Sequence, residues 1–337
     1  MRLLALAALA LLTAAPDPDA LQARYDSARD REERSLRAGD RAGAARARAD
    51  VLAAERHDHR PVAWRGARDA PGFAVPPIAR AERQKDARLA AQLAEVGASY
   101  RGWAAFWVHD LGTGAWAGWN SDARFPAAST VKLGVLVEAL RRGHAAGSPL
   151  WYDLRQLAGW SSNLAANRVT RRLGGERVVA SSLRRLGARA STYPGPYRAG
   201  TSAAADAPRP PSHGHTRVTT AHDLGRILYA LQAAAAGNRH VQRTTGLSRT
   251  EAGRGIALLV HSVRGGLLEP FFSAPVAHKE GWISDLRASA AIVYGRTPRI
   301  VVVLAYRPGI TEAEGRALGR RVAALTLDWH SPMERRT

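Results

Sequence analysis

The residues with the clearest chemical potential in this chain are Ser129 and Lys132, three positions apart at the start of an apolar run that extends to Leu140. Pro126 and small residues precede the serine, which predicts a loop that leads into a helix. On a helix, positions i and i+3 are neighbours, so the hydroxyl and the amine can meet. Serine becomes a strong nucleophile when an adjacent base takes its proton, and a neutral lysine can be that base. The alternative is an ordinary helix N-terminus with a lysine on the surface, because that arrangement has the same spacing of serine and lysine.

The composition favours the chemical interpretation. The 49 basic residues include only three lysines, Lys85, Lys132 and Lys279, so arginine fills nearly every position where any cation would serve. Arginine does not deprotonate in proteins, whereas lysine can. A position that keeps lysine is therefore a candidate for an amine that takes up and releases protons.

Residues 1–20 have the three-part form of a secretory signal, with a positive start, an apolar stretch and small residues near Ala15 and Ala20, where cleavage is expected. The alternative is an apolar helix that stays in the mature protein. Cysteine is absent, which excludes disulfides, thiol catalysis and cysteine-based zinc sites. We expect a secreted protein, or one held in the periplasm or cell envelope.

The formal charge of +20 requires a nucleic-acid binder to be considered. No RNP-like aromatic run, zinc finger or dense basic tail accompanies the charge, so no nucleic-acid partner is expected. An arginine-rich surface that faces an anionic cell-envelope polymer is the simpler interpretation.

Three segments of different composition follow the signal. Residues 21–56 are rich in Ala and Arg and predict one or two exposed helices, with a break at Gly39 or Gly43. Residues 57–78 carry four prolines and predict an extended linker. His57 and His59 lie there without a third ligand nearby, so we expect no metal site. Residues 79–332 form the predicted main domain. The packing candidates of the extension are Leu21, Tyr25, Leu36 and Leu52.

The sequence of the main domain predicts strands at both ends and helices between them. Residues 102–111 and 115–119 read as a hairpin, and a block of helical patterns follows. Residues 275–282, 287–294 and 299–306 read as three further strands before a closing helix that starts at Thr311. This order implies one antiparallel sheet that is complete only when both ends of the domain meet.

Three short motifs resemble those of class A β-lactamases and penicillin-binding serine hydrolases. They are Ser129-x-x-Lys132, Ser161-Ser162-Asn163 and Lys279-Glu280-Gly281. The resemblance covers roughly residues 80–330. It implies an α+β fold of the β-lactamase/transpeptidase type, with a five-stranded antiparallel sheet flanked by helices. Lys132 and Ser161 are only 29 positions apart, so the helical lobe is expected to be shortened.

The resemblance also implies catalytic roles and no cofactor. Ser129 would be acylated by a small-molecule or peptidoglycan-like substrate, and Lys132 would take its proton directly or through water. Ser161 would pass a proton to the leaving nitrogen.

The same resemblance implies a set of substrate-binding residues. Asn163 would hold the substrate amide, and Lys279 and Arg287 would bind its carboxylate, with Arg287 facing back from the neighbouring strand. The oxyanion would lie between the backbone N–H groups of Ser129 and Trp282, the residue after Gly281.

Several positions depart from the family pattern. Ser162 stands where the family usually has Asp, and Glu280 stands where it has Thr or Ser. A carboxylate beside Lys279 would weaken its positive charge unless the two side chains lie on opposite faces of the strand, as alternation predicts.

The family's loop glutamate, which activates the water that hydrolyses the acyl-enzyme, has no counterpart here. No Glu occurs between Glu176 and Glu251, and the matching place falls near Pro196-Tyr197. The nearby substitutes are Asp206, His213 and His215. The sequence thus predicts an acyl-enzyme that is hydrolysed slowly. The competing hypothesis is a non-catalytic cell-wall-binding protein that retains the fold.

Overall fold

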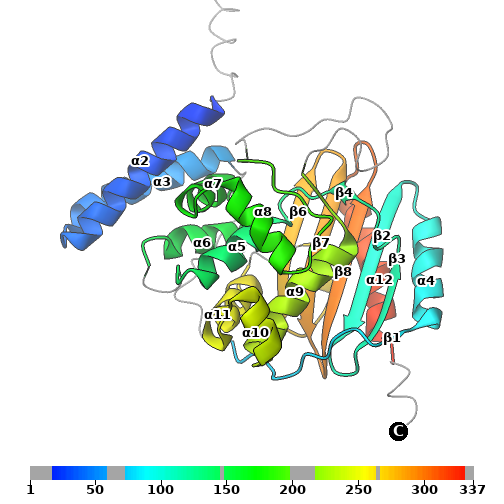
Figure 1. Cartoon of the computed structure of the whole chain (residues 1–337). Coiled ribbons are helices and arrows are strands. Elements are labelled where there is room, and N and C mark those ends of the chain that lie inside the picture. The colour runs from blue at the N-terminus through cyan, green and yellow to red at the C-terminus, as the bar shows by residue number, and fades with distance from the viewer. Residues whose placement is uncertain (1–16, 59–72, 145–147, 198–216, 263–265, 331–337) are drawn as a thin grey trace, which may run out of the picture. The chain divides into compact units, whose positions relative to one another are not determined.

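The computed structural model describes residues 17–58, 73–144, 148–197, 217–262 and 266–330 (Figure 1). The chain divides into a small unit that contains the N-terminal helices and a large unit that contains the sheet. Within these residues, no helix combines the length and the apolar character needed to cross a bilayer.

The small unit contains the helices α2 (Pro18–Arg37) and α3 (Arg41–Asp58), which pack against each other. The chain turns at Gly39 with φ 73°, where a side chain would be strained, so the predicted break falls there and not at Gly43. Leu21 and Tyr25 are buried as expected. The other two packing candidates are wrong, because Leu36 and Leu52 are exposed. The expected cleavage at Ala20 would fall inside α2, whereas residues 1–16 and most of the expected linker lie outside the described residues.

The large unit is built on a six-stranded sheet with the order β1-β3-β2-β8-β7-β6. The strands are β1 (Gln84–Lys85), β2 (Trp103–Asp110), β3 (Ala115–Trp119), β6 (Val276–Ile283), β7 (Leu286–Tyr294) and β8 (Pro298–Tyr306). The five long strands are antiparallel to their neighbours, as predicted, and β2 pairs with β8 so that the two ends of the domain meet. The short β1, which was not predicted, adds a parallel edge to β3.

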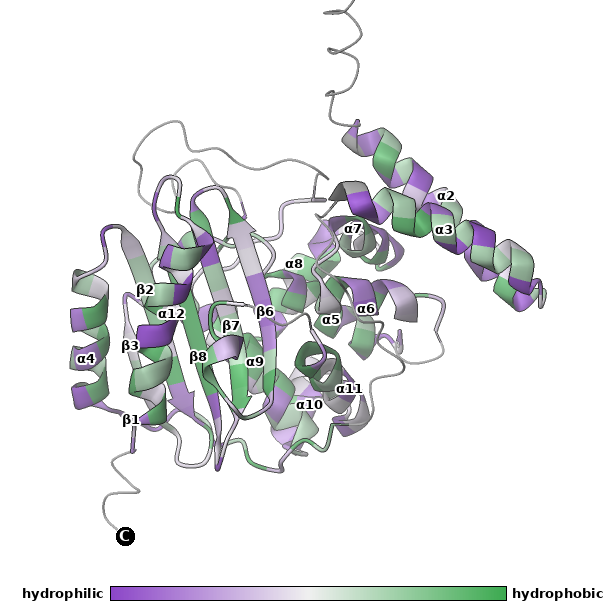
Figure 2. Ribbon diagram, turned by 180° about the vertical axis from the view of Figure 1, so that it is seen from behind, coloured by the Kyte–Doolittle hydropathy of each residue, from purple (hydrophilic) through white to green (hydrophobic). Residues whose placement is uncertain are grey.

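Helices cover both faces of the sheet (Figure 1). One face carries α9 (Ala221–Ala235), where Gly225 lets the Trp107 ring approach its backbone. The other face carries α4 (Ala87–Ala98) and α12 (Glu312–Leu327), and α12 lies in front of the sheet in Figure 2. Phe106 of β2 pairs directly with Val303 of β8. Both belong to the core on that face, because opposed residues of neighbouring strands point to the same side.

A helical lobe adjoins the sheet. Its helices are α5 (Lys132–Arg141), α6 (Trp151–Gly159), α7 (Asn163–Arg172), α8 (Glu176–Arg185), α10 (Arg239–Thr245) and α11 (Arg249–Val260). A two-stranded ribbon of β4 (Phe125–Pro126) and β5 (Val218–Thr219) precedes α5 and α9, and a 3₁₀ turn, η1 (Glu269–Phe271), precedes β6. The fully buried Glu138 of α5 binds Arg141, Arg142 and Arg185 and thereby ties α8 to α5.

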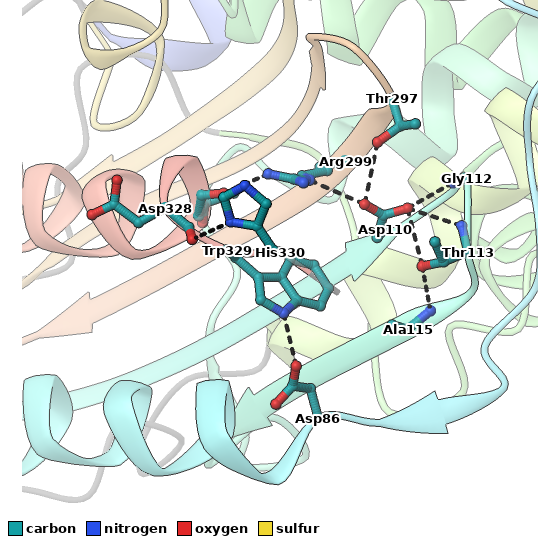
Figure 3. Close-up of polar contacts among 11 residues, drawn as sticks. Asp86, Asp110, Gly112, Thr113, Ala115, Thr297, Arg299, Asp328, Trp329 and His330 are labelled. Atoms are coloured by element: carbon teal, nitrogen blue, oxygen red, sulfur yellow. Dashed lines mark hydrogen bonds and ion pairs between the residues drawn. The ribbon is translucent and has the colours of Figure 1, made fainter. Parts of the chain in front are cut away.

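A polar network fastens the end of α12 to the sheet (Figure 3). The Asp86 carboxylate caps α4 and accepts the Trp329 indole N–H at 2.9 Å. Arg299 lies over the Trp329 ring and donates to Asp110 Oδ2 at 3.1 Å. These contacts hold Trp329, just beyond the end of α12, against α4 and the sheet.

Candidate active site

Ser129 lies in the turn between β4 and α5 and is half-buried. The residue before it, Ala128, has φ 44°, a left-handed conformation that costs a non-glycine residue about 1–3 kcal/mol. The turn is held by Thr130, whose hydroxyl donates to the Ala127 carbonyl at 2.6 Å, and by the Ala127 N–H, which donates to the Arg217 carbonyl at 2.9 Å. This strained and well-anchored turn gives the serine a fixed place at the start of α5.

Lys132 is the first residue of α5 and is fully buried. Its Nζ donates to the Ser161 carbonyl at 2.5 Å and lies 3.5 Å from Ser161 Oγ. A buried lysine needs partners for its amine, and Ser161 provides them. The first and second motifs therefore meet as the resemblance implied.

Ser161 occupies the short turn between α6 and α7, with φ 70° and almost no exposure. The left-handed backbone reverses the chain within a few residues, so that the carbonyl and the hydroxyl of Ser161 both lie beside the Lys132 amine. Asn163 follows as the first residue of α7 and is half-buried.

Lys279 reaches the same hydroxyl from β6. Its Nζ donates to Ser161 Oγ at 2.7 Å and to the Glu280 carbonyl at 3.0 Å. Burial lowers the pKa of Lys279 from 10.5 to about 7, against the opposing effect of the Glu280 carboxylate. Two of the three lysines of the chain thus converge on one serine hydroxyl, and the Lys279 amine is close to its titration point at neutral pH.

Gly281 brings the backbone of β6 against the Ser129 turn. A side-chain carbon at position 281 would lie 3.0 Å from Thr130 Cγ2 and 3.2 Å from Ser129 N, so only glycine allows this approach without a shift. The next residue, Trp282, is nearly half exposed. The N–H groups of Ser129 and Trp282 therefore belong to adjoining segments, as an oxyanion site between them requires.

We expect Gly281→Ala to lower the rate at which a fluorescent penicillin labels the protein by up to about 10²-fold, because displacement of reacting groups by an ångström can cost that much. Gly253→Ala is the control, since no atom lies within 4 Å of the added carbon there. The measurement is the second-order rate constant for covalent labelling by the fluorescent penicillin. Equal rates in the two variants would show that the close approach is unimportant.

The Glu280 side chain lies on the face of β6 opposite to Lys279, as strand alternation predicted. It accepts hydrogen bonds from Ser289 Oγ at 2.7 Å and from the Leu267 N–H at 3.3 Å. The carboxylate therefore does not occupy the place next to Ser161 where the lysine amine lies.

The structure corrects the expected position of Arg287. This residue pairs with Trp282 across the β6–β7 ladder. A Cβ atom added to Gly315 of α12 would lie 2.9 Å from the Cβ and Cγ atoms of Arg287. The guanidinium donates to the carbonyls of Ile283 and Leu286. Arg287 thus lies on the α12 face, and the structure does not bring it to the serine and the two lysines on the other face.

The loop after α8 is held by contacts that sequence reasoning missed. The Asp223 carboxylate accepts the Ser191 hydroxyl and the Ala190 N–H, each at 2.8 Å, and burial raises its pKa. The Arg217 guanidinium donates to the Gly195 and Pro196 carbonyls. The sequence signal was present in Thr220 and Asp223, which form an N-terminal helix cap.

The three proposed substitutes for the loop glutamate, Asp206, His213 and His215, lie outside the described residues. Among the described residues, no group of three or more His, Cys, Asp or Glu side chains could hold a metal ion.

A sequence model described as the β-lactamase enzyme family matches residues 88–150 and 148–330. The chain belongs to this family. The matched residues include all three motifs.

Solved structures of the β-lactamase type share the fold. PBP-A is 20% identical with a TM-score of 0.58, and the match covers 74% of this chain and all of PBP-A. A variant of the last common ancestor of class A β-lactamases of Gram-negative bacteria is 22% identical with a TM-score of 0.57, covering 72% of this chain and 98% of that one. A β-lactamase from Streptosporangium roseum is 18% identical with the same TM-score and the same coverage. No curated protein sequence matches this chain.

Proposed function

We propose that the protein is an exported serine hydrolase that forms an acyl-enzyme at Ser129 with β-lactams or related amides and esters. The observation that carries this proposal is the convergence of the Lys132 and Lys279 amines on Ser161 beside the half-buried Ser129. Neutral lysine and a relaying hydroxyl are the groups that an acyl transfer to serine needs. The natural substrate class in this proposal is peptidoglycan-like.

Each step of acylation has a candidate group. Lys132 takes the Ser129 proton directly or through water while the serine oxygen bonds to the substrate carbonyl carbon. The N–H groups of Ser129 and Trp282 stabilise the oxyanion. As the C–N bond breaks, the proton passes from Lys132 through Ser161 Oγ, which lies 3.5 Å from Lys132 Nζ, to the leaving nitrogen. Asn163 and Lys279 hold the substrate amide and its carboxylate.

Labelling with a fluorescent penicillin tests the proposal directly. We expect one label on each chain, seen as a mass increase of one intact penicillin by mass spectrometry of the whole protein. A relative supports the choice of probe, because the structure of a PBP-A point mutant is described as an acyl-enzyme complex with penicillin G. A folded protein that takes up no label would contradict the proposal.

Lys132→Arg should slow acylation by about 10² to 10⁴, the range of a lost general base. The arginine keeps the charge but cannot act as a base, so Lys132→Ala should be similarly slow. Lys85→Arg is the matched control, because Lys85 is exposed and outside the site. The measurement is the labelling rate, and a normal rate in the Lys132→Arg variant would show that Lys132 serves only as a cation.

The pH dependence of acylation tests Lys279. Because its pKa is about 7, the ammonium loses its proton as the pH rises through neutrality, and attraction for an anionic β-lactam is lost with it. Lys279→Arg stays charged throughout this range. We expect the ratio of the Lys279→Arg rate to the native rate to rise between pH 6 and about 9. A ratio that does not change with pH would show that the Lys279 charge plays no part.

The alternative function is a non-catalytic protein that binds an anionic cell-envelope polymer. The net charge of +20 favours this alternative. It predicts polymer binding that weakens with salt and no covalent labelling, so the penicillin experiment separates the two functions.

A further inference from the structure

A second serine of the chain is hydrogen-bonded to a histidine, which is hydrogen-bonded in turn to a carboxylate, away from the Ser129 site. Ser262 follows the end of α11, and its Oγ lies 2.8 Å from His278 Nε2. The other ring nitrogen, His278 Nδ1, lies 3.1 Å from Glu280 Oε1. A nucleophile within hydrogen-bond reach of a base, which is oriented in turn by a third group, is the arrangement that activates serine in hydrolases.

The partners of Glu280 determine how the proton is placed in this cluster. A carboxylate can only accept hydrogen bonds, so it places the imidazole proton on Nδ1 and leaves the Nε2 lone pair toward Ser262. Ser289 and the Leu267 N–H hold the same carboxylate in position. The backbone of Gly266 lies close against it, since a side chain there would come within 2.1 Å of Glu280 Oε1. The carboxylate is therefore fixed from three sides.

This cluster is separate from the Ser129 site because of strand alternation. Lys279 points to one face of β6, whereas His278 and Glu280 point to the other. His278 is only 2% exposed, whereas Ser262 is half-buried. The base is thus shielded from water, and the serine that it faces is less buried than the base.

We propose that Ser262, His278 and Glu280 form a second nucleophilic centre, which reacts with small esters and phosphonylating reagents independently of Ser129. With an ester, Ser262 Oγ bonds to the carbonyl carbon and its proton passes to His278 Nε2. The bond between that carbon and the leaving alkoxide then breaks, and the alcohol leaves with the proton from His278. Water reverses these steps to release the acid and restore the serine.

The test uses the full-length Ser129→Ala protein, from which the first nucleophile has been removed. It is treated with a small alkyl fluorophosphonate, which forms a serine O–P bond as the P–F bond breaks, and the modified residue is located by peptide mass spectrometry. We expect one phosphonyl group at Ser262 and none at the exposed Ser273. Modification of both serines to the same small extent would overturn the proposal, because it would show general reactivity of exposed hydroxyls.

Two further variants separate chemistry from folding. In the Ser129→Ala background, Ser262→Ala should remove the modification, and Glu280→Gln should slow it by about 10²-fold or more, because the amide no longer fixes the imidazole proton on Nδ1. The amide preserves the size of Glu280, and thermal unfolding reports whether each variant is folded. A folded Glu280→Gln protein that reacts at the parent rate would show that the cluster only anchors the segment after α11 to β6. Penicillin labelling of the protein with native Ser129 is scored separately, so failure here leaves the proposed function standing.

Discussion

Ser129→Ala is expected to abolish covalent labelling by penicillin, the largest single effect that the site predicts. The other groups of the site can still bind a β-lactam, but no oxygen remains at the position where the acyl bond would form. The site's second hydroxyl, Ser161, accepts from Lys279 and is nearly inaccessible, so it should not replace the lost nucleophile. The measurement is intact mass after prolonged incubation with the fluorescent penicillin.

The fold should survive this change. Ser129 is half-buried, and the turn around it is held by Thr130 and by the Ala127 N–H. Removal of one partly exposed hydroxyl should change the free energy of unfolding by no more than about 0.5 kcal/mol. Ser273→Ala is the control and should label like the native protein. A persistent label in the Ser129→Ala protein would identify another nucleophile and refute the proposed mechanism.

The three motifs of the candidate site could be selected from the sequence because each motif carries its own local pattern. Lys279 and Ser161 are 118 positions apart, and neither propensity nor periodicity brings them together. Their contact followed from the family resemblance. The scarcity of lysine in the composition was an independent sign, and the structure places both motif lysines on one hydroxyl.

Arg287 shows what a sequence pattern cannot determine. The β6–β7 turn pairs Ile283 with Leu286, so Lys279 faces the same side as its partner Ala290. Arg287 is an odd number of positions from Ala290 and therefore lies on the other face. A turn longer by one residue would have reversed this result. The side on which a strand residue lies depends on the register, and the sequence alone left the register open.

Other features depended on tertiary contacts that have no local signal. The edge strand β1 is only Gln84–Lys85, too short for an alternation pattern. The bonds of Ser289 to Glu280 and of Ser262 to His278 join residues that become neighbours only when β6, β7 and the segment after α11 lie together. In the sequence, Glu280 is a departure from the third motif of the family. In the structure, its carboxylate is hydrogen-bonded to His278, Ser289 and the Leu267 N–H.

The second large effect is expected in turnover. Class A enzymes hydrolyse the acyl intermediate with a water that a loop glutamate activates, and residues 177–250 of this chain contain no glutamate. In the part of the loop that the structure describes, Ser191 and Ala190 donate to the Asp223 carboxylate of α9. A tyrosine such as Tyr197, with a usual pKa of about 10, is a poor base near neutral pH. Loss of general-base assistance should slow deacylation by about 10² to 10⁴.

Stopped-flow hydrolysis of a chromogenic cephalosporin should therefore show a burst of about one product per enzyme, followed by slow turnover. In the sequence, Pro196 lies near the position of the missing glutamate, and the residue is exposed. Pro196→Glu is therefore expected to raise the rate of deacylation. Pro196→Gln, whose side chain has nearly the same size as glutamate, should not raise it. Rapid linear turnover without a burst in the native protein would mean that another base activates the water. The base would then be identified by three variants, Asp206→Asn, His213→Ala and His215→Ala. Loss of the residue that activates the water should slow deacylation and produce a burst.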